Sequence, residues 1–539
     1  MHPVSLLGML ALLGLGWAMS YHRREVRLRP IFWGIGLQFV LALIILRQDD
    51  WSFVGMALLG LLIVSYLLRE DSEVSKAWRR MAIVLGATLG LGLLLQLLPS
   101  RLLGWALAVV MAALLVNSRF KLAPPAQRYG AALFVVLGVS WLVSGGLHGR
   151  EIFQAFSVKV AAFLNLSDYG AKFLFGNLVD PQHFFVDSDS PWPGFGFQFA
   201  FKVLPTIIFF GGFMGVLYYL GIMQKVIESF SHFMRWTIGT SGAETLSCSA
   251  NVFVGQTEAP LLIKPFLDGM TQSELLTIMV GGFATIAGGV LAGYIAMGVP
   301  AGHLVAATVM SAPAALVMGK LIYPEKEHSQ TAGDLKLPEV EAGGNAIEAA
   351  SNGISDGFKL ALNVGAMLVG FIALIAVVDV ILNFLDSLID GRLLDGAIVT
   401  YSSGGMSPIT SEFSGIFPGS LQTLFGTLLR PLAWLMGVPW ADAAKVGNLL
   451  GVKLSLNEFV AYGTLGTYIQ AEALSERAVI ISTYALCGFA NFASIGIQIG
   501  GISAVAPGRK SDLARVGLKA MFGGALASWL TATIAGMLL

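Results

Sequence analysis

Charged residues are scarce in this chain of 539 residues. Lys, Arg, Asp and Glu together make up 12% of it, about half of the share that is typical of soluble domains. Hydrophobic residues make up 55%. Because the formal net charge is zero, we expect no general attraction to nucleic acid.

Cysteine is nearly absent as well. The two cysteines, Cys248 and Cys487, lie in apolar stretches, which indicates neither a disulfide framework nor a metal site. The seven histidines are scattered, and no nucleophile lies near a base in a recognisable pattern. We therefore expect no enzyme, no catalytic residues and no cofactor.

Long apolar runs recur from end to end, and most are long enough to cross a bilayer as a helix. They predict an all-α polytopic membrane protein, with candidate spans at 3–20, 31–47, 52–68, 81–98, 101–117, 129–146, 203–222, 272–293, 302–320, 357–383, 479–503 and 514–538. Three loops rich in Lys and Arg, 21–30, 69–80 and 118–128, are predicted to be cytoplasmic. This orientation puts both termini outside, in a cytoplasmic or plasma membrane.

The stretch Thr237–Phe266 cannot cross a membrane as an ordinary helix. Gly255 and Pro260 interrupt it, and six polar residues divide its apolar sequence: Glu244, Asn251, Gln256, Thr257, Glu258 and Lys264. Irregular backbone at membrane depth is tolerated only inside protein or beside a cavity, and an ionisable residue there indicates a functional site. We therefore predict a re-entrant hairpin, the alternative being a polar loop that holds Glu258 in headgroup water.

A second interrupted stretch, Val446–Tyr462, contains Lys453, Asn457 and Glu458, with Gly447 and Gly451 as expected breakers. Each interrupted stretch is followed by a helix with a polar, small-residue centre, GFATIA at 282–287 and GFANFA at 488–493, and then by a last span. The predicted topology enters the two units from opposite sides. Paired interruptions in inverted repeats are typical of a transporter site.

The side chains of these segments suit recognition rather than bond-making. Glu258 and Glu458 can accept hydrogen bonds from the hydroxyls of a neutral polyol. Four polar residues offer mixed donors and acceptors for a base and a sugar: Gln256, Thr257, Asn491 and Ser494. Phe489 can stack on a ring. The alternative for the carboxylates is a general acid and base pair, as in a glycosidase.

Six blocks of sequence, in order along the chain, resemble the concentrative nucleoside transporter family. They are ETLSCSANVFVGQTEAPLLIKPFL (244–267), GGFATIAGGVLAGY (281–294), ATVMSAPAALVMGKLIYPE (307–325), NEFVAY (457–462), ALCGFANFASIGI (485–497) and APGRKSD (506–512). The resemblance covers 3–47 and about 151–539. It implies a homotrimer in membrane lipid, with a scaffold and a transport subdomain that moves like an elevator.

The same resemblance implies the site residues. Nucleoside contacts of the family fall on Gln256, Thr257, Glu258, Val290, Glu458, Phe489, Asn491 and Ser494. The family's sodium ligands fall on Asn251, Val254, Thr285 and Ile286. Members that use protons tend to lack the Asn at position 251, so its presence favours Na+ as the coupling ion. Gly255 lies where the family varies between Gly and Ser, and an uncrowded base end favours purines as well as pyrimidines.

The family pattern also divides the chain. We expect scaffold helices at 1–47, scaffold elements at 151–236, a cytoplasmic linker at 323–356, a long scaffold helix at 357–385, and an exterior excursion with an interfacial helix at 386–440. Transport repeats are expected at 237–322 and 441–539. The departure from the family is an inserted four-helix membrane region at 48–150, and the sequence does not indicate what this region does.

Together these features predict sodium-coupled symport of nucleosides of the uridine, cytidine and adenosine class. The nearest alternative is a proton-coupled nucleoside transporter. A channel-like pore would not require inverted repeats, and a membrane enzyme would turn over its substrate without any ion gradient.

Overall fold

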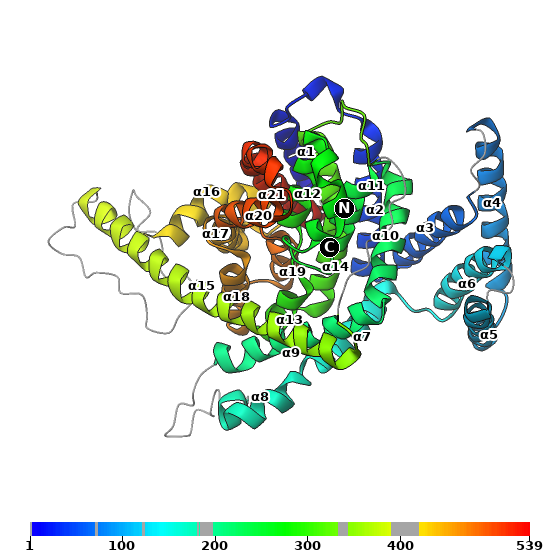
Figure 1. Ribbon diagram of the computed structural model, residues 1–539, viewed down its shortest axis with the longest axis horizontal. Helices are drawn as coiled ribbons and strands as arrows, with labels where there is room; N and C mark the ends of the chain where they lie inside the picture. The colour runs from blue at the N-terminus through cyan, green and yellow to red at the C-terminus, as the bar shows by residue number, and fades with distance from the viewer. Residues whose placement is uncertain are drawn as a thin grey trace. The chain divides into compact units, whose positions relative to one another are not determined.

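The computed structural model describes residues 3–69, 74–120, 124–180, 183, 198–331, 343–389 and 420–539. Across these ranges the regular secondary structure is entirely helical (Figure 1). Eight helical stretches of the described residues are long and apolar enough to cross a membrane. The predicted all-α polytopic fold is therefore confirmed. Within the exterior excursion predicted at 386–440, residues 390–419 lie outside the described residues.

One compact unit is built from Gly36–Phe156. Its helices are most of α2 (Leu28–Leu46), α3 (Asp50–Leu67), α4 (Val74–Leu95), α5 (Ser100–Phe120), α6 (Pro124–Ser144) and the start of α7 (Gly149–Leu164). Helix α6 packs against α3, α4 and α5, with Val64, Ala132 and Val136 buried together. The region 48–150, predicted as an insertion, lies within this unit.

The other compact unit contains Ser157–Met537 and the chain up to Ile35, which includes the first turns of α2. It begins with α1 (Pro3–Ala18) and continues with α8 (Ser167–Phe175), α9 (Phe199–Tyr219) and α10 (Ile222–Ile238). The remaining helices form two repeats of the same plan, joined by α15 (Ala346–Ile389) and α16 (Leu421–Leu435).

The first repeat opens with a helical hairpin, here called hairpin 1. Its arms are α11 (Gly242–Ala250) and the 3-10 helix η4 (Ala259–Gly269), with an irregular tip between them. A broken helix follows, α12 (Gln272–Ala284) and α13 (Gly288–Ala296), and then α14 (Ala301–Ile322). Capping boxes start both α11 and α12, since Ser241 pairs with Glu244 and Thr271 with Glu274.

The second repeat has the same order. Hairpin 2 consists of α17 (Trp440–Ser455) and α18 (Glu458–Gln470). The broken helix is α19 (Glu476–Leu486) followed by α20 (Phe492–Val505), and α21 (Lys510–Leu538) ends the repeat. Asn457 caps α18 and Asn491 caps α20, each accepting a backbone N–H bond through its side-chain oxygen. The predicted paired hairpins and paired broken helices are therefore present.

The break in hairpin 2 does not lie at the predicted glycines, and that prediction was wrong. Gly447 and Gly451 lie inside α17, and the helix ends at Ser455, with Leu456 as its C-cap. A Cβ at Gly447 would lie 2.9 Å from the Arg430 nitrogen, and one at Gly451 would lie 2.1 Å from the Phe425 ring. These glycines therefore let α16 approach α17 closely, as small residues do between membrane helices.

Helix α15 begins earlier than predicted, at Ala346 rather than 357. The side chain of Asn345 accepts bonds from the backbone N–H groups of Ile347 and Glu348, so it acts as the N-cap. The early turns of α15 cross α9, where a Cβ at Gly353 would lie 2.3 Å from the Gly211 oxygen (Figure 1). A polar stretch that resembles a linker is thus helical because it packs on α9.

Each repeat carries buried charge on the first arm of its hairpin. In hairpin 1, Glu244 Oε2 lies 2.6 Å from Lys320 Nζ of α14, and both side chains are almost fully buried. In hairpin 2, the Lys453 ammonium donates to the carbonyls of Ala485 and Cys487 and to Ser528 of α21. Both arms are therefore tied to the last helix of their own repeat.

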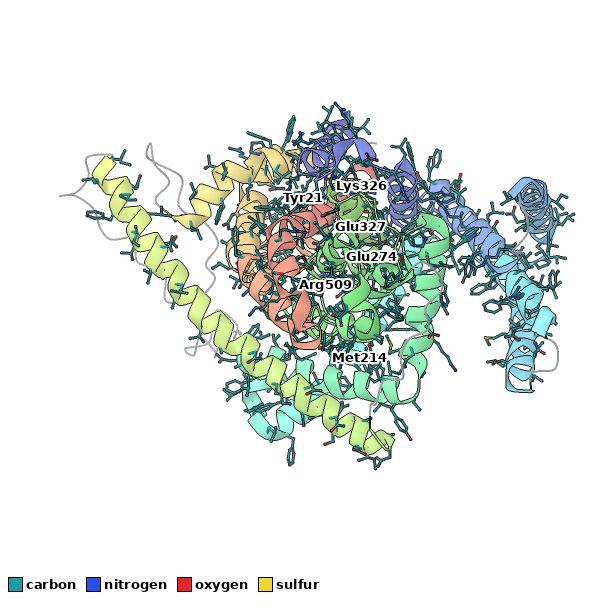
Figure 2. The ribbon with its side chains drawn as sticks, turned by 45° about the horizontal axis from the view of Figure 1, so that its top comes forward. Tyr21, Met214, Glu274, Lys326, Glu327 and Arg509 are labelled. Atoms are coloured by element: carbon teal, nitrogen blue, oxygen red, sulfur yellow. The ribbon has the colours of Figure 1, made fainter. Side chains whose placement is uncertain are left out.

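The loop after α14 returns to the start of the first repeat. The hydroxyls of Ser329 and Thr331 each lie 2.6 Å from Glu274 Oε1, and the Thr331 carbonyl accepts from Gly242 N at 2.9 Å. Figure 2 labels Glu274 at this junction. The loop thus fixes the beginnings of α11 and α12 together.

Candidate functional site

A cavity of about 560 Å³ lies where the two hairpins and the two broken helices meet. This volume is within the range of small-molecule sites. The tip of hairpin 1, the start of α13, the tip of hairpin 2 and the break between α19 and α20 line it, and α15 supplies one wall. The wall includes all eight residues predicted to contact a nucleoside: Gln256, Thr257, Glu258, Val290, Glu458, Phe489, Asn491 and Ser494.

Glu458 lies at the first position of α18 and is only 4% exposed. The Tyr294 hydroxyl donates to Oε1 at 3.1 Å, and Asn491 Nδ2 donates to Oε2 at 3.4 Å. Tyr294 comes from α13 of the first repeat and Asn491 from the break of the second repeat. Two other elements thus hold this carboxylate, which is ready to accept from a ligand hydroxyl at the wall of the cavity.

An amide network forms the neighbouring part of the wall. Gln256 Nε2 donates to the Ser494 hydroxyl at 3.3 Å, and Gln498 Nε2 donates to Gln256 Oε1 at 3.0 Å. Asn491 Oδ1 accepts from Ser494 N at 2.8 Å. The tip of hairpin 1 is thereby joined to the start of α20 through side chains that can both donate and accept.

Glu258 is held differently. Its side chain is exposed, and Oε2 accepts from Gly255 N at 2.9 Å within the same tip. The carboxylate projects from the end of hairpin 1, just before η4 begins at Ala259. Both carboxylates can thus meet a polyol, but among the described residues the side chains of other elements bond to Glu458 and not to Glu258.

The residues predicted to bind sodium lie beside this cavity, where α11 and α12 end. Asn251 Nδ2 donates to the Ser247 carbonyl at 3.1 Å, whereas its buried Oδ1 has no hydrogen-bond partner among the described residues. A Cβ on Gly281 of α12 would lie 3.4 Å from Asn251 Nδ2. Asn251 Oδ1 is therefore a buried acceptor that a cation could satisfy.

The break between α12 and α13 supplies the rest of this candidate ion site. Thr285 and Ala287 have extended backbone, so carbonyls of the break are free of the regular helical pattern. The Thr285 hydroxyl donates to the Gly281 carbonyl at 2.8 Å, and Gly288 N donates to Phe253 O at 3.3 Å. Val254 and Ile286 are buried in the same two segments. A site whose ligand atoms are all oxygens suits a hard cation.

Sequence reasoning missed several residues of the site. Tyr294 and Gln498 position predicted residues, and Asn363 of α15 and Asn457 of hairpin 2 line the cavity themselves. Gln498 and Asn363 are isolated amides within apolar helices, which is a usable signal. Tyr294 offered no such signal, because a tyrosine at the end of an apolar run usually lies at a membrane interface.

Three family models match the chain. Residues 7–67 match the Na+ dependent nucleoside transporter N-terminus, 200–301 match nucleoside recognition, and 303–536 match the Na+ dependent nucleoside transporter C-terminus. The first match extends through α3, beyond the boundary at residue 47 to which the sequence resemblance reached.

Relatives among curated proteins cover most of the chain. An uncharacterized transporter of Haemophilus influenzae is 42% identical over 81% of this chain and 97% of its own length. Sodium/nucleoside cotransporter 1 of Rattus norvegicus is 38% identical over 93% of this chain and 75% of its own length.

Solved structures that are similar to this chain point to the same family as the sequence relatives. CNTnw in an inward-facing substrate-bound state has a TM-score of 0.71 and 32% identity, covering 99% of this chain and 97% of that chain. A CNTnw variant in an outward-facing state also has a TM-score of 0.71, at 32% identity over 99% of this chain and 97% of that chain. The chain belongs to the family of sodium-dependent, concentrative nucleoside transporters.

Proposed function

We propose that this protein is a sodium-coupled symporter that brings nucleosides into the cell. The observation that carries the proposal is the meeting of both hairpin carboxylates, Glu258 and Glu458, with uncharged amides and an aromatic ring around one cavity. Two carboxylates can each accept from the ribose hydroxyls, and amides such as Gln256 can pair with a base. A neutral, amphipathic ligand fits this wall.

Sodium is favoured over protons by Asn251. Its buried Oδ1 lacks a hydrogen-bond partner among the described residues, and a bound cation would satisfy it. The candidate ion ligands lie in two segments, the tip of hairpin 1 and the break after α12. The tip also carries the substrate residues Gln256, Thr257 and Glu258, and the break leads into α13, which carries Val290. Ion binding in this arrangement would order the part of the wall that the nucleoside needs, which couples the two binding events.

Transport requires that the cavity open to each side in turn, and we propose an elevator-type movement of the two repeats against the scaffold. Support comes from CNTnw structures similar to this chain, which are described as inward-facing, outward-facing and intermediate. We further propose a homotrimer with both termini outside, as the family resemblance and the basic loops imply. Native mass spectrometry and site-specific labelling of the termini test these two points.

Purines are proposed as substrates beside pyrimidines because Gly255 leaves the end of the cavity open. A Cβ at this position would lie 3.6 Å from the Glu258 carboxyl carbon, in ordinary contact, so a Ser would fit there. We expect Gly255→Ser to change the ratio of adenosine to uridine uptake while uridine uptake persists. An unchanged ratio would remove Gly255 from the selectivity argument.

The direct test is uptake of labelled uridine and adenosine into liposomes that contain the purified protein. An inward sodium gradient is compared with an inward proton gradient in the absence of sodium. Accumulation that requires sodium supports the symporter. Accumulation driven by protons alone would retain the nucleoside cavity and discard the sodium site, and no accumulation would overturn the proposed function.

A further inference from the structure

A second cavity, here called the inner vestibule, has a volume of about 540 Å³. It lies between α9, the first turns of α15 and the tip of hairpin 1. Three of its lining residues, Glu258, Ala287 and Leu360, also line the substrate cavity. The two cavities therefore share a wall, and the Glu258 carboxylate stands at that boundary.

The order of residues along α15 gives the vestibule its direction. The helix lines the vestibule from Ala349 to Leu360 and lines the substrate cavity from Leu360 to Ala366. The vestibule thus lies toward the membrane face at which α9 ends and α15 begins. The orientation predicted from the basic loops makes that face cytoplasmic.

The chemistry of the vestibule is two-sided. Phe210, Tyr218 and Phe253 give it an aromatic side, on which Met214, labelled in Figure 2, also lies. The side that belongs to α15 is polar, with Asn352, Ser355, Asp356 and Lys359. A heterocyclic base can stack on the aromatic side, and sugar hydroxyls can bond to the polar side.

One polar atom of this wall lacks a partner. The Tyr218 hydroxyl is buried, and no described residue forms a hydrogen bond with it. Buried hydroxyls in proteins are nearly always bonded. Because Tyr218 and Glu258 both line the vestibule, a ligand hydroxyl or base edge there can reach the tyrosine hydroxyl and the carboxylate that borders the substrate cavity.

We propose that the inner vestibule is a second, transient binding site for the nucleoside, which the ligand occupies after it leaves the substrate cavity. The inference rests on the proposed function. In this site the base stacks against the aromatic side of α9, Tyr218 bonds to the ligand, and the polar turns of α15 bind the sugar. Glu258 serves both sites, so it can remain bonded to the ligand as the ligand passes.

The test is protection of an introduced thiol. Ser355→Cys puts a thiol on the polar side of the vestibule, and Ser351→Cys puts one on an exposed position of the same helix that lines neither cavity. The native thiols of Cys248 and Cys487 are buried and should not react. The assay uses detergent-solubilised protein in the presence of sodium. Uridine should slow maleimide labelling of the Ser355→Cys thiol at least about threefold, because the bound ligand covers it. Labelling of the Ser351→Cys thiol should not change.

Closure of the protein around uridine in the substrate cavity would also protect the thiol, so the assay is repeated with Glu458→Gln added. Protection that persists supports independent binding in the vestibule. Tyr218→Phe should raise the half-protecting uridine concentration about three- to tenfold, the effect of one hydrogen bond. Its neighbour Tyr219, which is exposed and lines neither cavity, supplies the control Tyr219→Phe.

The outcomes separate the two proposals. Two results would overturn the vestibule site alone, provided that the wild-type protein accumulates uridine. In the first, uridine does not protect the Ser355→Cys thiol. In the second, uridine protects it, but adding Glu458→Gln removes the protection. Failure of the wild-type protein to accumulate any nucleoside overturns the proposed function and this inference with it.

Discussion

The two hairpins follow one plan but differ in how firmly their tips are held. In hairpin 2 the second arm is the α-helix α18, and Glu458 at its start is bonded by Tyr294 and Asn491 from other elements. In hairpin 1 the second arm is the 3-10 helix η4, and Glu258 bonds only within its own tip among the contacts described. One carboxylate is therefore preorganised and the other is not.

The 3-10 arm adds to this difference. Such helices usually run for three or four residues, because their hydrogen bonds are poorly aligned. Here η4 runs from Ala259 to Gly269 and contains Pro260 and Pro265, which cannot donate backbone bonds. Hairpin 1 therefore has the weaker arm, and it is also the one whose tip borders both cavities. We infer that hairpin 2 holds the ligand while hairpin 1 adjusts to ion and ligand.

Removing the buried lysines that tie each hairpin to the last helix of its repeat, Lys320 and Lys453, should have the largest effect, a loss of stability. Lys320→Met leaves the Glu244 carboxylate buried without its cation, which costs about 3–5 kcal/mol of unfolding free energy. Lys453→Met leaves only uncharged acceptors unpaired, so about 1–3 kcal/mol is expected. Denaturation of the purified proteins in detergent measures both.

The double variant Glu244→Gln with Lys320→Met controls for the charge. It should recover part of the loss, because no uncompensated carboxylate remains. Equal stability of Lys320→Met and the wild-type protein would show that the anchor of hairpin 1 contributes nothing.

Neutralising the tip carboxylates tests transport rather than stability. Glu258→Gln and Glu458→Gln should each lower uridine uptake at least about 100-fold, since each removes charge-assisted bonds to the ligand. Size-exclusion profiles should match the wild-type profile. Wild-type uptake by both variants would contradict the assignment of the site.

Asn251→Ala tests the ion side of hairpin 1. Removing the unpartnered Oδ1 should raise the half-saturating sodium concentration roughly tenfold, with a smaller change in uridine affinity at saturating sodium. Ser249→Ala is the matched control, because that hydroxyl already bonds to the Thr245 carbonyl within α11. An unchanged sodium dependence in Asn251→Ala would exclude Asn251 as a ligand.

Tyr294→Phe should give the smallest effect and reports on the preorganisation of Glu458 alone. Losing one donor to the carboxylate should weaken uridine binding about three- to tenfold and leave the sodium requirement unchanged. Tyr462→Phe is the control: its ring stacks on Tyr294, but its hydroxyl donates to the Thr483 carbonyl. Equal weakening in both variants would point to packing instead of the hydrogen bond.

Much of this arrangement could be predicted because the membrane restricts what polar residues can do. Glu258, Gln256 and Asn491 were predicted as site residues because polar side chains interrupt apolar helices only at a cost. The order of hairpin, broken helix and final helix followed from the same interruptions. The all-helical fold was predicted correctly from the long apolar runs, and the family from the six blocks of sequence that resemble it.

The features that could not be predicted from the sequence depend on tertiary contacts. Gly447 and Gly451 are packing glycines rather than breakers because α16 lies against them, and no local pattern distinguishes the two roles. The polar start of α15 is helical because α9 packs on it, although Asn345 is a capping signal that could have been read. The Tyr294 bond to Glu458 joins residues far apart in the sequence and could not be predicted.

The central claim is that sodium binding and nucleoside binding are coupled, because hairpin 1 and the break after α12 contribute to both candidate sites. The most direct measurement is the uridine dissociation constant of the purified protein at increasing sodium concentration, with choline keeping the ionic strength constant. The account predicts that saturating sodium lowers this constant at least about tenfold, and that uridine lowers the sodium dissociation constant by the same factor. A uridine dissociation constant that is the same with and without sodium would contradict it.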